Sequence, residues 1–198
     1  MPKTRLTLVT PHEERALDPE VGTGQIVVAT VWIPFRERYS ETRKTHMESA
    51  LRELLDRQAL VDLVGAYARA MDLQRSGDLV ELFTEDAVLD YGPGFGVIRG
   101  HKEMRERFGS GQRIFESSRH YLTNIKIDFE GPDRARGVTY LYAWHRFGGG
   151  KPDGHVYGEY RDRFVRESGG WRIAERRLLV AAEQDFPTDW APIPELGA

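Results

Sequence analysis

The chain has 198 residues, of which 40% are apolar and 30% are charged. This length suits one domain plus an appendage and is sufficient to bury a hydrophobic core. The formal net charge of -3 argues against nucleic acid as the main partner, and the absence of cysteine excludes disulfides, thiolate zinc sites and cysteine nucleophiles. The most apolar run, at residues 26–35, is too short to span a bilayer and starts too late for a signal peptide, so we expect a cytoplasmic protein.

A change in composition near residue 46 predicts two unlike parts, an N-terminal extension at residues 1–46 and a folded domain at residues 47–198. The extension contains four prolines, a glycine pair and the charged stretch RERYSETRK, without a sustained helical period. We expect it to be poorly ordered, or to contribute at most one short strand from Gln25 to Ile33. Met47 is either the natural start of the protein or the residue that follows a regulatory or oligomerisation arm.

The domain is predicted to begin with a long helix. Apolar residues recur at helical spacing from Leu51 to Met71, with Ser49 as a candidate N-cap, and the pattern stops near Leu73. The elements predicted next are a short helix at residues 77–83, a strand at residues 86–91, a glycine-rich turn at residues 92–96 and a third helix at residues 101–108.

Segments with strand-like alternation follow at residues 120–129, 135–147, 155–165 and 171–181. Turns that contain glycine, at residues 131–133, 148–154 and 167–170, separate these four segments from one another. Helices followed by a strand meander predict an α+β fold, with the helices packed on one face of a mostly antiparallel sheet.

Candidate chemistry lies on a few side chains: Tyr67 and Asp72 close the long helix, Tyr91 follows the first strand, and His120 and His145 lie on later strands. They supply a base, a group to orient it and several donors, which suits proton abstraction next to a carbonyl, or loss of water, without a cofactor. Because imidazole has an ordinary pKa of roughly 6.5, a histidine is a suitable base at cytoplasmic pH. An aspartate that accepts a hydrogen bond from Nδ1 would set the tautomer of that base.

Each of these residues also has an ordinary structural interpretation. Asp72 could cap the next turn or pair with Arg69 or Arg75, and His145 could bond a neighbouring strand side chain. Tyr67 lies on an apolar helical row and could fill the core, whereas a tyrosine hydroxyl in a pocket could stabilise an enolate.

The order of elements and four sequence blocks resemble the SnoaL-like group of the nuclear transport factor 2-like superfamily. The blocks are LFTEDAVLDYGP, SSRHYLTN, AWHR and GGWRIAERRL, and the resemblance covers residues 47–181. In that superfamily three helices and a strongly curved sheet form a cone whose interior is the ligand pocket. The branch most similar to this chain contains scytalone dehydratase, bile acid 7-alpha-dehydratase and hexachlorocyclohexane dehydrochlorinase.

The resemblance implies a role for each candidate residue. Those enzymes remove water or HCl by pairing a helix-end aspartate with a strand histidine, which correspond to Asp72 and His120. Tyr67 and Tyr91 match tyrosines of the dehydratases, and His145 matches a second active-site histidine of scytalone dehydratase. The dehydrochlorinase has a lysine in place of Tyr67, which argues against dehalogenation.

An arginine near the centre of the last strand also serves the dehydrochlorinase, and Arg176 or Arg177 could correspond to it. Strand alternation places these two side chains on opposite faces. Arg177 shares parity with Trp171 and Ile173 and is therefore favoured for substrate binding, unless a bulge reverses the choice.

The predicted function is a cofactor-independent lyase, similar to a dehydratase, that acts on a cyclic or polycyclic carbonyl compound through a His-Asp general base. The alternatives are an isomerase or polyketide cyclase with the same pocket, or a non-catalytic binding protein. An iron site of Asp72, His120 and His145 is disfavoured because the usual close His-x-Asp/Glu pairing is missing, so no metal or cofactor is expected.

The predicted partner is a small-molecule substrate, without nucleic acid or a membrane. A homo-oligomer is also expected, because Tyr140, Tyr142 and Trp144 would expose an apolar patch on the outer face of the sheet in a monomer. The resemblance implies a trimer, with a dimer as the alternative.

Overall fold

The structure is a computed structural model that describes residues 35–109, 115–186, 188 and 190–196. The chain divides into two compact units, Met1–Thr42 and Arg43–Ala198, and the second unit contains every candidate site residue. The strand expected from Gln25 to Ile33 lies outside the described residues. The division at residue 46 stays a prediction.

Helix α1 (Phe35–Asp72) begins well before the predicted start at Ser49, so the prediction of no helix in the charged stretch is wrong. The cause is composition, because arginine, glutamate and lysine form helices readily without an apolar period. Residues 41–55 are all exposed, so this part of α1 buries no face and does not need apolar residues at helical spacing. Within the described ranges, no helix is long and apolar enough to cross a membrane.

Short elements connect α1 to the main sheet. They are α2 (Ser76–Val80), β1 (Phe83–Asp90), β2 (Val97–Arg99) and α3 (Gly100–Gly109). The predicted helix at residues 77–83 therefore ends earlier, since Phe83 already belongs to β1, and β2 was not predicted. The turn between β1 and β2 contains Gly92 and Gly96, both with positive φ, and their hydrogen bonds close the hairpin.

Four long strands complete the fold: β3 (Ser117–Phe129), β4 (Arg134–Arg146), β5 (Gly154–Glu167) and β6 (Gly170–Gln184). Together with the hairpin they form a six-stranded sheet in the order β2-β1-β6-β5-β4-β3. All neighbouring pairs are antiparallel except β1 and β6, which run parallel. The predicted α+β class and mostly antiparallel sheet are confirmed, and the six strands with their helices form the expected cone-shaped fold.

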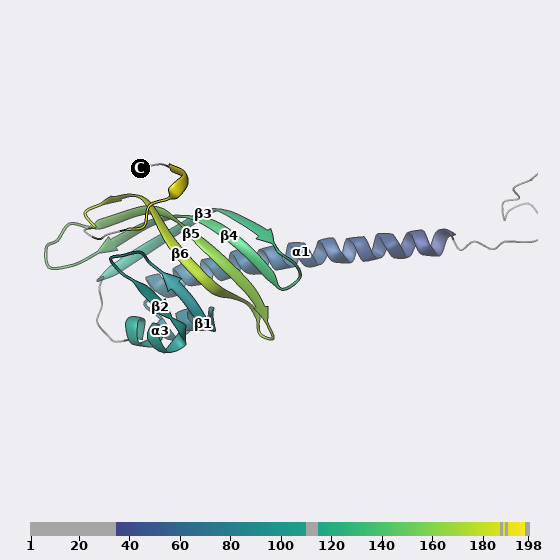
Figure 1. Cartoon of the computed structure of the whole chain (residues 1–198), viewed down its shortest axis with the longest axis horizontal. Helices are drawn as coiled ribbons and strands as arrows, with labels where there is room; N and C mark the ends of the chain where they lie inside the picture. Colours follow the sequence, from purple (N-terminus) through teal and green to yellow (C-terminus); the bar gives the residue numbers. More distant parts are fainter. Residues whose placement is uncertain (1–34, 110–114, 187, 189, 197–198) are drawn as a thin grey trace, which may run out of the picture. The chain divides into compact units, whose positions relative to one another are not determined.

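The second half of α1 packs on the inner face of this sheet (Figure 1). Leu60, Val64 and Tyr67 share one face of the helix and are almost completely buried. Two polar contacts hold the same stretch at one end, because Arg57 donates to the carbonyl oxygen of Ile127 at 3.0 Å and Trp171 donates to Asp56 at 3.2 Å. The hydrogen bond of Arg57 thereby ties this part of α1 to β3.

Removal of residues 1–46 should change the stability of the protein little. Because residues 41–55 are exposed, we expect the free energy of unfolding to change by less than about 1 kcal/mol. Urea unfolding of a chain that starts at Met47 would measure this. A control chain that starts at Ala59 loses the contacts of Asp56 and Arg57 with the sheet and should be clearly less stable. A loss of several kcal/mol in the first chain would make the extension integral to the fold.

Candidate active site

A cavity of 390 Å³ opens between the end of α1, α3 and the inner face of the sheet. Its walls are mainly apolar and aromatic, and include Phe95, Phe115, Phe186 and Trp190. Phe186 and Trp190 belong to the segment after β6, which returns to the sheet through the hydrogen bond from the Val180 amide to the Ala191 carbonyl. The polar side chains in its walls come from the end of α1, from α3 and from several strands.

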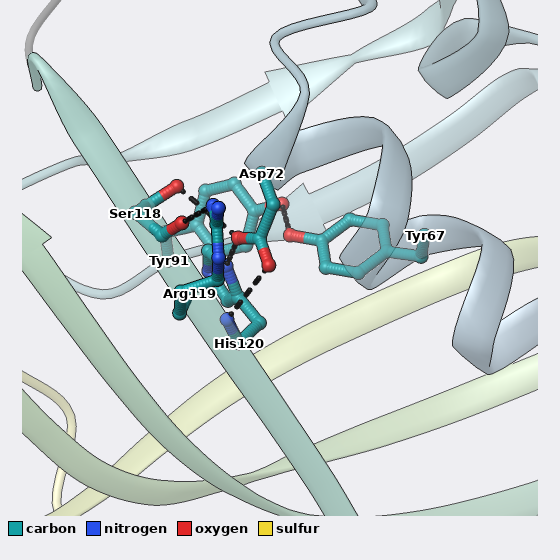
Figure 2. Close-up of polar contacts among 6 residues, drawn as sticks. All are labelled: Tyr67, Asp72, Tyr91, Ser118, Arg119 and His120. Atoms are coloured by element: carbon teal, nitrogen blue, oxygen red, sulfur yellow. Dashed lines mark hydrogen bonds and ion pairs between the residues drawn. The ribbon is translucent and has the colours of Figure 1, made fainter.

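Asp72, the last residue of α1, contacts β3 through three hydrogen bonds (Figure 2). His120 donates from Nδ1 to Oδ1 at 2.7 Å and from its backbone amide to Oδ2 at 3.1 Å, and Ser118 Oγ donates to Oδ1 at 3.2 Å. The side chain of His120 is only 4% exposed. With Nδ1 occupied as a donor to the carboxylate, Nε2 is left as an acceptor on the side of the cavity.

A C-terminal Schellman turn brings Asp72 into this position. The amide of Arg75 bonds the carbonyl of Ala70, the amide of Gln74 bonds that of Met71, and Gln74 has a φ of 53°. Asp72 thus occupies the last helical turn, where the helix dipole disfavours a carboxylate. The donors of Ser118 and His120 compensate for this cost, which explains why an acidic residue is tolerated there.

Tyr67 and Tyr91 also meet, with 2.8 Å between their hydroxyl oxygens. Tyr160, on β5, packs edge-on against Tyr67 with 5.5 Å between ring centroids. Burial raises the pKa of Tyr91 and of Tyr160 well above the usual range, and the neighbouring Tyr67 adds to the effect. The buried phenols Tyr91 and Tyr160 therefore stay protonated and can donate hydrogen bonds into the cavity.

His145 lies beside His120, with 5.4 Å between ring centroids and a nearly perpendicular arrangement. Phe115 and Phe186 contact the same ring, and its Nδ1 has no hydrogen-bond partner among the described residues. Burial lowers the pKa of His145 to about 3, with a further contribution from His120. His145 is therefore a neutral imidazole at physiological pH.

Arg176 lies beneath the tyrosines rather than in the cavity wall. Its guanidinium forms a bidentate ion pair with Asp162 at 2.7 and 2.8 Å, and both side chains are fully buried. It stacks on the rings of Tyr67 and Tyr160, at 3.9 and 4.2 Å from their centroids. Burial alone would lower the pKa of Arg176, but Asp162 outweighs that effect and keeps the guanidinium charged.

The prediction that Arg177 faces the pocket is wrong. The pairing of β5 with β6 shifts register at Ala174, between Glu175 opposite Arg163 and Ile173 opposite Phe164. This bulge reverses the alternation, so Arg176 points inward and Arg177 outward, where its side chain is 56% exposed and pairs with Asp90.

Several site residues were not identified from the sequence. Ser118 shares Asp72 with His120, and Asp162 neutralises Arg176. Asp162 lies between Tyr160 and Phe164 on the inward face of β5, and a charged residue in an apolar row is a signal that predicts a buried partner. Phe186 and Trp190 also line the cavity. They follow the last strand, so no strand alternation indicated that their side chains point inward.

The described residues contain no group of three or more histidine and carboxylate side chains arranged to hold a metal ion. His120 and Asp72 bond each other directly, and His145 presents an unpaired nitrogen among aromatic rings. The donor set thus differs from an open two-histidine, one-carboxylate site.

Comparisons with known proteins agree with the fold. A structure of a scytalone dehydratase-like protein from Novosphingobium aromaticivorans superposes with a TM-score of 0.68 at 28% identity, over 73% of this chain and 97% of that one. An uncharacterized protein of Mycobacterium tuberculosis is 30% identical over 63% of this chain and 84% of its own length. Gamma-hexachlorocyclohexane dehydrochlorinase from Sphingobium indicum is 23% identical over 67% of this chain and 85% of that protein.

The family model for the SnoaL-like domain matches residues 52–177, which include all the candidate catalytic side chains. The similarity to the scytalone dehydratase-like protein and to the dehydrochlorinase confirms the resemblance expected from the sequence blocks. The chain therefore belongs to the SnoaL-like domain family of the nuclear transport factor 2-like superfamily.

Proposed function

We propose that the protein is a cofactor-independent lyase that removes water from a cyclic or polycyclic carbonyl compound. The observation that carries this proposal is the Asp72–His120 pair at the edge of a largely apolar cavity. Relatives that include a dehydrochlorinase support an enzymatic role of the lyase or isomerase type. The size of the cavity suits a ligand with one to a few rings.

In the proposed reaction, His120 Nε2 takes the proton from the carbon next to the carbonyl, and the released electron pair moves to the carbonyl oxygen. Asp72 stabilises the imidazolium that forms. Hydrogen bonds from Tyr67 or Tyr91 hold the developing enolate oxygen, and they act strongly because both phenols are buried. The electron pair then returns and expels the hydroxyl group from the neighbouring carbon.

The leaving hydroxide takes the proton from the His120 imidazolium and departs as water, which restores the neutral base. His145 supplies a hydrogen bond to the leaving oxygen. A neutral imidazole is suited to this task, since it can donate from one nitrogen without placing a second positive charge beside His120.

An isomerase or cyclase is the second candidate, because the same base and enolate contacts serve it without a leaving group. A binding protein is the third. Exchange of the α proton of a bound cyclic ketone in heavy water, followed by NMR, separates both enzymes from a binding protein. A screen of cyclic hydroxy-ketones for the absorbance change of elimination separates the lyase from the isomerase.

The first functional prediction concerns the His-Asp pair. With a substrate from the screen, His120→Ala should lower turnover by about 10²–10⁴-fold, because a general base contributes that much. Asp72→Asn should slow turnover with little effect on substrate binding, since the amide no longer stabilises the imidazolium.

Steady-state kinetics of the double variant provide the sharper test. If the two side chains act as a unit, the double variant is barely slower than His120→Ala. His155→Ala is the matched control, because His155 lies on the opposite face of the sheet beside Tyr142 and should keep full activity. Independent, multiplying effects, or full activity of His120→Ala, would rule out the pair as the base.

The second functional prediction concerns the neutral state of His145. The pKa of His145 is about 3 in the folded chain and has its ordinary value in the unfolded chain. At a pH between these two values, only the unfolded chain binds the proton, so acid favours unfolding. From pH 7 to pH 5 this group should remove about 2 kcal/mol from the free energy of unfolding. Urea titrations of the wild type and of His145→Gln at both pH values should show a smaller loss in the variant. Equal losses would mean that His145 is protonated in the folded state.

The third functional prediction concerns assembly. We expect a homo-oligomer, a trimer or a dimer, whose interface covers an outer tyrosine surface of Tyr121, Tyr140, Tyr142 and Tyr157. Three of these side chains are 44–56% exposed, and Tyr121 and Tyr157 both stack on Tyr142. A large exposed apolar surface of this kind favours association.

Sedimentation at micromolar concentration tests the assembly. The variant with Tyr121→Lys and Tyr157→Lys should dissociate, whereas Val97→Lys, an exposed apolar residue away from the tyrosine surface, should not. A monomeric mass for the wild type would contradict the prediction.

A further inference from the structure

Among the described residues, the acidic and basic side chains that line the cavity carry one sign of charge. In the described part of the chain, no aspartate or glutamate lines the cavity, whereas Arg75 and Arg107 both do. Asp72 lies behind His120 and Ser118 and does not reach the lining. A ligand in the cavity therefore meets two arginines and, among the described residues, no carboxylate in its walls.

The two arginines belong to neighbouring elements at one edge of the cavity. Arg75 lies in the turn between α1 and α2, and Arg107 lies in the last turn of α3. The elements meet there, because a Cβ added to Gly109 would lie 3.8 Å from Ser76 Oγ. Both arginines are exposed, so they mark the entrance, whereas the buried His120 marks the interior.

Both guanidinium groups keep donors available. Arg107 gives one hydrogen bond, from Nη2 to the Phe95 carbonyl at 3.2 Å. Arg75 approaches Asp78 at 3.7 Å, and both of these side chains are at least 60% exposed, so the pair contributes little. A guanidinium carries five N–H donors, and most of those on the two arginines are unused within the described residues.

We propose that the substrate carries a carboxylate, which Arg75 and Arg107 hold at the entrance while its ring system occupies the apolar interior. This inference rests on the proposed function and specifies its substrate class as an aromatic or polycyclic carbonyl acid. The planar fork of arginine matches the two oxygens of a carboxylate. Anchoring the acid at the entrance orients the reacting carbon toward His120 and would discriminate against neutral analogues.

The test compares two probes of the same shape, 2-naphthoate and 2-naphthamide, by isothermal titration calorimetry at low salt. The wild type should bind the acid about tenfold more tightly than the amide, because each charged contact in a partly exposed site contributes modestly. The variant with Arg75→Gln and Arg107→Gln should bind both probes equally. The preference of the wild type should also shrink at high ionic strength, since salt screens exposed charges.

Arg105→Gln is the matched control, because it removes the same charge from α3 but Arg105 faces Glu81 rather than the cavity. It should keep the preference for the acid. Equal binding of the two probes by the wild type, loss of the preference in the control, or no binding of either probe would overturn the proposal. In the same titration, His120→Ala should still bind 2-naphthoate more tightly than 2-naphthamide. The titration therefore tests the carboxylate site, whereas the kinetics of His120→Ala test the proposed base.

Discussion

The carboxylate of Asp72 joins the end of α1 to the start of β3, and the candidate site depends on this junction. Three donors from Ser118 and His120 satisfy it, although the helix dipole disfavours a negative charge at that position. The backbone amide of His120 fixes where the strand begins relative to the helix, and Nδ1 fixes the ring. A single carboxylate thus ties the end of the helix to the sheet and orients the base.

A second buried charge supports the other half of the site. Arg176 would be costly in the core without Asp162, and its stacking on Tyr67 and Tyr160 places a permanent positive charge under the phenols. This charge favours partial negative charge on the hydroxyl oxygens and so strengthens them as donors. The Asp162 pair keeps the net charge of this layer near zero.

The cavity therefore combines apolar walls with two groups of polar side chains, one buried and one exposed. At the inner end, His120 and His145 stand close together, and only the ring bonded to Asp72 has a carboxylate partner. At the entrance, Arg75 and Arg107 remain exposed to solvent. Proteins of one fold catalyse different reactions because the side chains in their sites differ. The reaction of this protein therefore depends on the polar side chains of the cavity, and not on the fold alone.

The sequence by itself determined the α+β class, all four long strands to within three residues at each end, and the identity of the candidate base and its aspartate. These features follow from local periodicity and from sequence blocks, which do not require knowledge of the folded chain. The orientation of Arg176 was decided only by the bulge at Ala174, because one extra residue exchanges the faces of a strand. The closure of the cavity by Phe186 and Trp190, and the meeting of Ser76 with the end of α3, likewise depend on contacts between distant segments, which no local pattern records.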